Sequence, residues 1–321
     1  MTSQSPSTRQ APAAQVPGRV SPPLLLVGHG TRSDAGVAEF ARLTGRVRER
    51  AAGRVRAVDG GFIELARPSV ADAVTRLVSA MAGRAGPVAA VPLVLTAAGH
   101  GKGDIPAALA REVRRHPGLS FSYGRPLGPH PVLQDVLAAR IDAALAGTPR
   151  GEAHVVLAGR GSTDPDANAE IAKVARLLWE GRGYAGVEFC FISLAEPSVP
   201  AALERAVLLG ARRIVVAPYF LFPGVLPDRV VAQSRQFAAG RPELDVAVAG
   251  LIGACGELAG LVLERYDEAL AGDIRMNCDT CAYRVALPGF ADKVGRPQVP
   301  HYHPDESPAH RHEHAAHEVL S

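Results

Sequence analysis

Hydrophobic and polar positions follow two periods along most of this chain, and the same succession occurs twice. Short apolar runs predict buried strands near residues 24–28, 55–63, 88–95 and 119–123, then near 154–158, 187–193, 213–221 and 245–249. Longer amphipathic segments predict helices near 34–51, 68–83, 104–115 and 131–146, then near 166–180, 197–209, 227–238 and 255–271. Strands that alternate with helices in this way are typical of parallel sheets.

The two halves also repeat each other in residue type. The segment 24–31 reads LLLVGHGT, and the segment 155–162 reads VVLAGRGS. FIELARPSV at 62–70 likewise returns as FISLAEPSV at 191–199. We therefore predict an α/β fold of two similar lobes with a cleft between them. Each lobe would hold a parallel four-stranded sheet flanked by helices and close its own core.

The repeat sets the expected domain limits. Residues 1–22 read as a disordered tail, 23–150 as the first lobe, 151–271 as the second lobe, and 272–321 as a His-rich appendix containing MNCDTC. The first 22 residues lack the apolar stretch of a signal peptide, and no segment resembles a membrane span. A formal charge of +3 and the lack of basic runs argue against nucleic acid. We expect a cytoplasmic protein; its oligomeric state is left open.

Three potential metal ligands follow consecutive predicted strands of the first half: His29, Glu64 and His100. Because the carboxyl ends of parallel strands meet at one edge of a sheet, these side chains should converge. Two imidazoles and a carboxylate suit a divalent first-row metal such as cobalt, iron, nickel or zinc, and also proton abstraction. Taken one by one, each is more simply explained without a metal: His29 as a turn residue, His100 as a loop residue and Glu64 as a solvated strand end.

The second half lacks this set. Arg160 stands where the first copy has His29, Ser193 stands where it has Glu64, and 222–226 replaces the loop that holds His100. A lobe without these ligands but with an arginine at the cleft can hold an anionic substrate. A structural ion pair is the alternative role for Arg160.

Together these motifs resemble the sirohydrochlorin chelatases of the long type called CbiX. The resemblance covers roughly residues 24–280. It rests on the GHG turn at 28–30, on FIE at 62–64 before Pro68-Ser69, on AAGH at 97–100 before DIP at 104–106, and on the doubled module and MNCDTC. It implies a chelatase-like fold and the insertion of a divalent metal, Co²⁺ favoured, into sirohydrochlorin in cobalamin biosynthesis. A ferrochelatase for sirohaem is the alternative, and a non-enzymatic metal-storage protein or metallochaperone is an alternative from another class.

The resemblance also implies residue roles. It assigns metal binding and proton handling to His29 and His100, and also to Glu64. Because the tetrapyrrole carries many carboxylates, Arg160 and Lys102 are predicted to bind it. Arg32, Arg67 and Arg125 are further candidates for such contacts.

Cys278 and Cys281 form a C-x-x-C step that some family members associate with an iron–sulfur cluster. A four-iron cluster usually needs more thiolates than this step supplies. A zinc or cobalt site and a reversible disulfide therefore remain open as well. The tail beyond them holds six of the eleven histidines, which fits a weak metal-gathering segment or an unselected polar tail.

Overall fold

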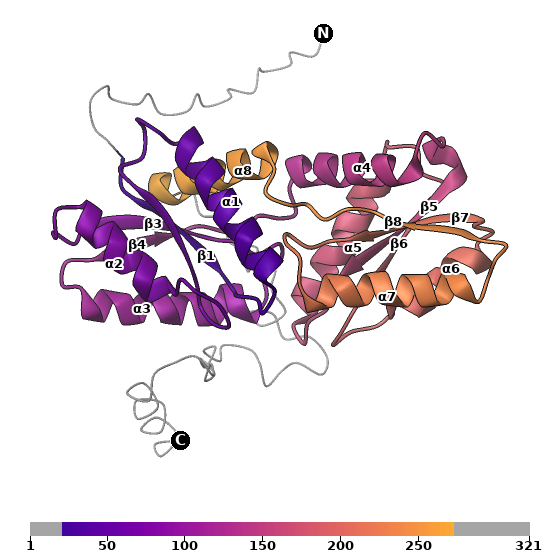
Figure 1. Cartoon of the computed structure of the whole chain (residues 1–321), viewed down its shortest axis with the longest axis horizontal. Helices are drawn as coiled ribbons and strands as arrows, with labels where there is room; N and C mark the ends of the chain where they lie inside the picture. The colour runs from indigo at the N-terminus through magenta and orange to yellow at the C-terminus, as the bar shows by residue number, and fades with distance from the viewer. Residues whose placement is uncertain (1–20, 273–321) are drawn as a thin grey trace, which may run out of the picture.

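Residues 21–272, which the computed structural model describes, form two α/β lobes that lie side by side (Figure 1). Both sheets are parallel and share one topology, with the strand orders β2-β1-β3-β4 and β6-β5-β7-β8. The strands of the first sheet are β1 (Leu24–Gly28), β2 (Val58–Phe62), β3 (Pro87–Pro92) and β4 (Ser120–Tyr123). Those of the second are β5 (Ala153–Gly159), β6 (Gly186–Phe191), β7 (Arg213–Pro218) and β8 (Asp245–Val248). The predicted fold class is confirmed.

Eight α-helices alternate with these strands in the described part of the chain. Those of the first repeat are α1 (Asp34–Arg50), α2 (Val70–Ala80), α3 (Ile105–Arg115) and α4 (Pro131–Leu145). Those of the second are α5 (Pro165–Trp179), α6 (Val199–Leu208), α7 (Val225–Ala239) and α8 (Gly256–Ala271). Every predicted strand and helix is present, with its ends within three residues of the prediction. The short helices η1 (His100–Asp104) and η2 (Arg150–Glu152) were not predicted.

The two repeats exchange their last helices. Helix α4 packs against β7, β8 and α5 of the second lobe, whereas α8 returns to pack against α1 and β3 of the first (Figure 1). One hydrophobic core consequently runs through both lobes, from Leu26 and Phe40 to Leu133 and Val155. The prediction that each repeat closes its own core is wrong, because one face of each sheet is covered by a helix from the other repeat.

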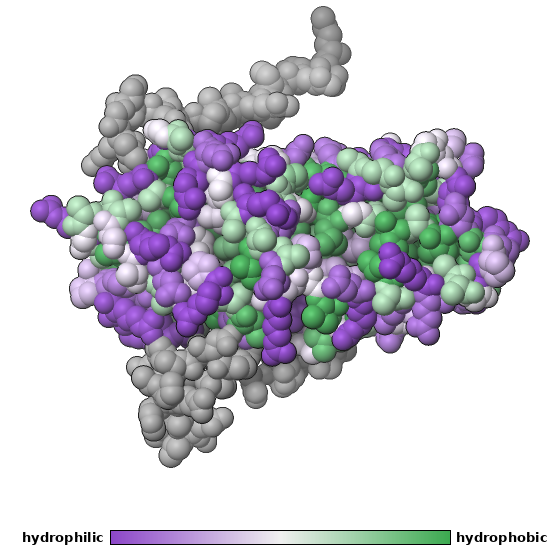
Figure 2. All heavy atoms as spheres, viewed as in Figure 1, coloured by the Kyte–Doolittle hydropathy of each residue, from purple (hydrophilic) through white to green (hydrophobic). Residues whose placement is uncertain are grey.

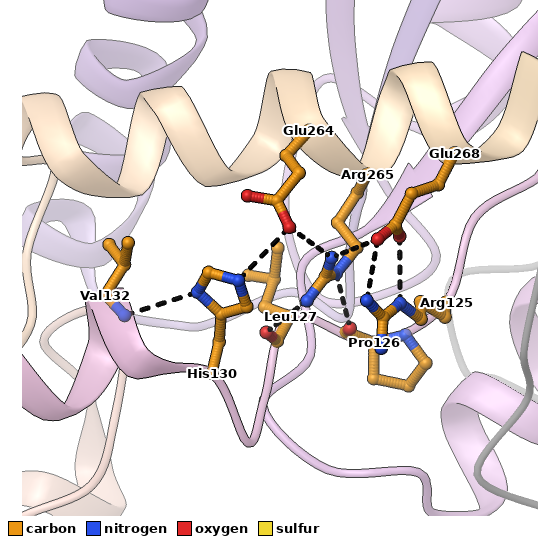
Figure 3. Close-up of polar contacts among 8 residues, drawn as sticks. All are labelled: Arg125, Pro126, Leu127, His130, Val132, Glu264, Arg265 and Glu268. Atoms are coloured by element: carbon orange, nitrogen blue, oxygen red, sulfur yellow. Dashed lines mark hydrogen bonds and ion pairs between the residues drawn. The ribbon is translucent and has the colours of Figure 1, made fainter. Parts of the chain in front are cut away.

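The buried guanidinium of Arg265 fastens α8 to the segment that enters α4 (Figure 3). Its Nε donates to the carbonyl oxygen of Pro126 at 3.1 Å, and its Nη2 donates to that of Leu127 at 3.3 Å. Its Nη1 lies 2.9 Å from Glu268 and 3.2 Å from Glu264. Desolvation lowers the pKa of this guanidinium, and the two carboxylates oppose that shift. The donors of Arg265 thus satisfy carbonyl groups at the point where the chain crosses between lobes.

A histidine caps α4 at the same crossing. The His130 Nδ1 accepts a hydrogen bond from the backbone N–H of Val132 at 3.3 Å, which places the ring proton on Nε2. This Nε2 lies 3.1 Å from a carboxylate oxygen of Glu264 on α8 (Figure 3). The cap therefore links the start of one exchanged helix to the other.

None of the helices between residues 21 and 272 is both long and apolar enough to cross a bilayer. The face seen in Figure 2 carries hydrophilic side chains over both lobes, and its hydrophobic side chains gather in separate patches. Among the exposed apolar residues, Leu208 and Leu209 lie at the end of α6, with 79% and 64% of their surface accessible. A few exposed leucines of this kind are ordinary features of a protein surface.

The matching helices α2 and α6 offer a paired test of helix capping. Ser69 accepts from the Asp72 N–H at 3.1 Å while Asp72 accepts from the Ser69 N–H at 2.8 Å, whereas Ser198 makes no such side-chain bond. We expect Ser69→Ala to lower the free energy of unfolding by about 1 kcal/mol. Ser198→Ala, the matched control, should change it by less than about 0.5 kcal/mol. Urea unfolding of both variants measures the difference; equal losses would contradict the assigned cap.

Candidate active site

A cleft of about 720 Å³ opens between the lobes, at the carboxyl ends of the strands. The Gly-X-Gly turns that follow β1 and β5 border it from opposite lobes. Much of its lining is apolar and includes Phe62, Leu95, Ile171 and Phe222. A site that combines apolar walls with a few converging polar groups is typical of small-molecule binding.

The turn after β1 holds His29 against Glu64. Gly30 has a φ of 122°, and a Cβ at this position would come within 1.8 Å of the Glu64 carbonyl oxygen, so the turn requires glycine. The Glu64 N–H donates to the His29 carbonyl oxygen at 3.1 Å. The side chains also meet, with the His29 Nδ1 at 3.0 Å from the Glu64 Oε1 and 27% and 12% of the two side chains exposed. The structure therefore brings together two of the three predicted ligands in a partly open pair.

His100 begins η1 at the same edge of the sheet. Its side chain lies outside the described part of the structure, so its role stays a prediction. Among the side chains that are described, no group of three His, Cys, Asp or Glu residues is arranged to hold a metal ion. The candidate metal-handling group is thus the pair His29–Glu64.

The second lobe repeats the turn with an arginine. Gly161 has a φ of 84°, and the Ser193 N–H donates to the Arg160 carbonyl oxygen at 3.1 Å, as in the first lobe. The Arg160 side chain lines the cleft and remains accessible to solvent. Partial desolvation lowers its pKa, and the charge of Glu64 raises it. The carboxylate of Glu64, in the candidate metal-handling pair, therefore attracts Arg160 from the opposite lobe.

Lys102 joins the two lobes. Its Nζ lies 2.8 Å from Asp164 and 3.2 Å from Asp166, at the start of α5, and only 10% of the side chain is exposed. A substrate carboxylate would have to compete with both aspartates for this ammonium group. A second link lies nearby, where the Ala97 N–H donates to the buried carboxylate of Glu170 at 2.8 Å. Sequence reasoning missed these three acidic residues. For Asp164 a signal was available, because an Asp directly before a proline such as Pro165 is a usual sign of a helix start.

The other candidate arginines lie in different places. Arg32 lines the cleft. Arg67 borders a second cavity of about 370 Å³ next to the turn after β2, and it pairs with Asp72 at 2.9 Å. Arg125 binds Glu268 through two hydrogen bonds of 2.6 and 2.8 Å (Figure 3). It is not among the residues that line the cleft. Of these three, Arg32 alone lines the same cavity as His29.

Cys278, Cys281 and the His-rich tail lie outside the described residues. The two cysteines that are described, Cys190 and Cys255, are free thiols. Burial in β6 raises the pKa of Cys190 to about 12, so this thiol is protonated and packs as a small apolar side chain.

Comparisons with known proteins agree with the two-repeat organisation of the chain. The family model CbiX matches residues 23–144 and again 154–269, one match for each repeat. The chain is 37% identical to a sirohydrochlorin cobaltochelatase of Priestia megaterium over 72% of this chain and 75% of the relative. It is 28% identical to a sirohydrochlorin ferrochelatase of the same organism over 70% and 82% of the two chains.

Among solved structures, SirB from Bacillus subtilis with Fe³⁺ superposes with a TM-score of 0.66 at 27% identity, covering 79% of this chain and 97% of that one. The family model covers most of both lobes, and the fold agrees over nearly the whole of that relative. The chain therefore belongs to the CbiX family.

Proposed function

We propose that this protein inserts a divalent metal ion, with Co²⁺ as the preferred substrate, into sirohydrochlorin. The observation that carries the proposal is the His29–Glu64 pair, 3.0 Å apart, whose histidine lines the inter-lobe cleft together with Arg160, while Glu64 borders the adjoining second cavity. Relatives named for cobalt and for iron insertion both match, and the cobaltochelatase match is the higher in identity, 37% against 28%.

The chemistry of metal insertion accounts for such a pair. The incoming ion must lose bound water, and two pyrrole nitrogens must lose their protons. An imidazole and a carboxylate at a partly open site can hold the ion without enclosing it. The same groups can act as bases toward the pyrrole protons. His29 and Glu64 thus supply both functions, and His100 is proposed to assist them.

The second lobe is proposed to hold the tetrapyrrole. Arg160 presents a guanidinium that can form paired hydrogen bonds with a carboxylate of the substrate. Lys102 can do so only by leaving Asp164 and Asp166, so we assign the main anchoring role to Arg160. The apolar lining would exclude water from the ring and so strengthen the charge interactions of Arg160 and Lys102 with the substrate.

A side-by-side assay of metals tests the function. Purified protein should accelerate the spectral change of sirohydrochlorin on metal insertion with Co²⁺, and more slowly with Fe²⁺ and Ni²⁺ under anaerobic conditions. Protein-free reactions with each ion provide the baseline. Faster insertion of Fe²⁺ than of Co²⁺ would reverse the proposed preference. Rates equal to the baseline for all three ions would overturn the chelatase function.

The six histidines of the tail are the feature that favours a metal-storage protein or metallochaperone. A titration with metal-free sirohydrochlorin separates the two functions, because a chelatase must bind the tetrapyrrole and a storage protein need not. No finding supports an iron–sulfur cluster at Cys278 and Cys281, and the proposed reaction does not use one.

A further inference from the structure

The same strained turn follows β2 in one lobe and β6 in the other. Leu65 has a φ of 62° and Leu194 a φ of 64°, in the left-handed region that bulky residues rarely adopt. The N–H of Ala66 donates to the carbonyl oxygen of Glu64 at 2.7 Å, and the equivalent bond from Ala195 measures 2.8 Å. A hydrogen bond between residues two apart, around a residue of positive φ, defines a rare and strained γ-turn.

Folding alone does not account for a leucine at the apex. Leu194 has 65% of its surface exposed, so its side chain gains little from burial. A glycine at this position would adopt the same φ without strain. Strained backbone of this kind persists where the surrounding structure enforces it, and it is concentrated at ligand sites.

Both leucines line the cleft, one from each lobe. Each turn is also tied to the residue that acts in its lobe. Leu65 directly follows Glu64, and the residue before Leu194 donates its N–H to the carbonyl oxygen of Arg160. The two apolar side chains are thus held at defined positions relative to the metal-handling pair and to Arg160.

We infer that Leu65 and Leu194 are substrate-contacting residues that pack against the apolar surface of a flat macrocycle, one from each lobe. This inference rests on the proposed function and extends it. A carboxylate at the rim of the ring would pair with Arg160. The two leucines would pack against the conjugated surface and hold the ring beside His29 and Glu64. Their strained turns keep the side chains directed to the ligand instead of to the core.

Alanine variants test the contact in a fluorescence titration with metal-free sirohydrochlorin. We expect Leu194→Ala to weaken binding about tenfold and the double variant Leu65→Ala/Leu194→Ala about a hundredfold. Leu209→Ala is the matched control, because Leu209 is equally exposed, at 64%, but lies at the end of α6. Its affinity should stay within about twofold of the wild type.

Leu194→Gly separates binding from folding. This variant should melt at the same temperature as the wild type or higher, because strain is relieved, yet bind sirohydrochlorin about tenfold more weakly. Unchanged affinity in Leu194→Ala and Leu194→Gly, with a wild type that binds, would overturn the role of the leucines alone. Failure of the wild type to bind would overturn the proposed function and this inference together.

Discussion

His29→Ala is expected to lower the rate of cobalt insertion by at least about a thousandfold while leaving the fold intact. The substitution removes the proposed metal ligand and proton acceptor from the only described histidine–carboxylate contact whose histidine lines the cleft. The fold should survive, because His29 lies in a surface turn and its backbone contacts to Glu64 do not involve the imidazole. Stopped-flow absorbance with sirohydrochlorin and Co²⁺ measures the rate, and circular dichroism checks the fold.

His116 provides the matched control for this experiment. Its Nε2 lies 3.7 Å from Glu112, and 23% of its side chain is exposed, so it is a second histidine–carboxylate pair of similar exposure. It does not line the cleft, and His116→Ala should insert cobalt at the wild-type rate. The affinity of His29→Ala for sirohydrochlorin should change little, since Arg160 and the apolar walls remain. A normal insertion rate in His29→Ala would remove this residue from the mechanism.

The largest loss of stability is expected from Arg265→Ala, about 3–5 kcal/mol. The variant leaves the carbonyl oxygens of Pro126 and Leu127 without the donors that now reach them. It also opens a cavity where only 1% of the side chain is exposed. The melting temperature should fall by roughly 10 °C for a protein of this size. Because α8 and α4 are exchanged between lobes, we expect one cooperative transition and not the loss of a single lobe.

Thermal unfolding followed by calorimetry tests this expectation. Arg176→Ala is the control, because Arg176 pairs with Glu180 one helical turn away while both side chains stay largely exposed, at 66% and 58%. Such surface pairs contribute less than about 1 kcal/mol. A melting temperature of Arg265→Ala close to that of Arg176→Ala would show that the buried guanidinium does not hold the exchanged helices.

Local pattern was sufficient to predict the elements and the sheet edge at which His29, Glu64 and Arg160 lie. All five residues of β1 are buried, so the strand appears as a continuous apolar run ending at Gly28. The positions of His29 and Glu64 after their strands follow from this, as does the place of Arg160 in the second copy. These features depend on residues close in sequence, which periodicity and turn residues report well.

Long-range features escaped prediction for physical reasons. The apolar side of α4, with Leu133, Leu137 and Ile141, has the same pattern whichever sheet it covers. The contacts of Lys102 with Asp164 and Asp166 could not be predicted, because these two partners lie in the other repeat. The position of Leu65 holds neither glycine nor asparagine, the residues that usually mark a positive φ in a sequence. Only the repetition of its motif at Leu194 indicated that this turn is special.

The exchange of α4 and α8 means that the boundary between the repeats in sequence is not the boundary between the lobes in space. A chain divided near Thr148 would give two fragments, and each would carry the helix that covers the sheet of the other. The protein is therefore organised like a domain-swapped dimer whose subunits are joined end to end. Because both repeats lie in one chain, the mutual swap is intramolecular, so the two unlike turns of the cleft are assembled as a pair independently of protein concentration.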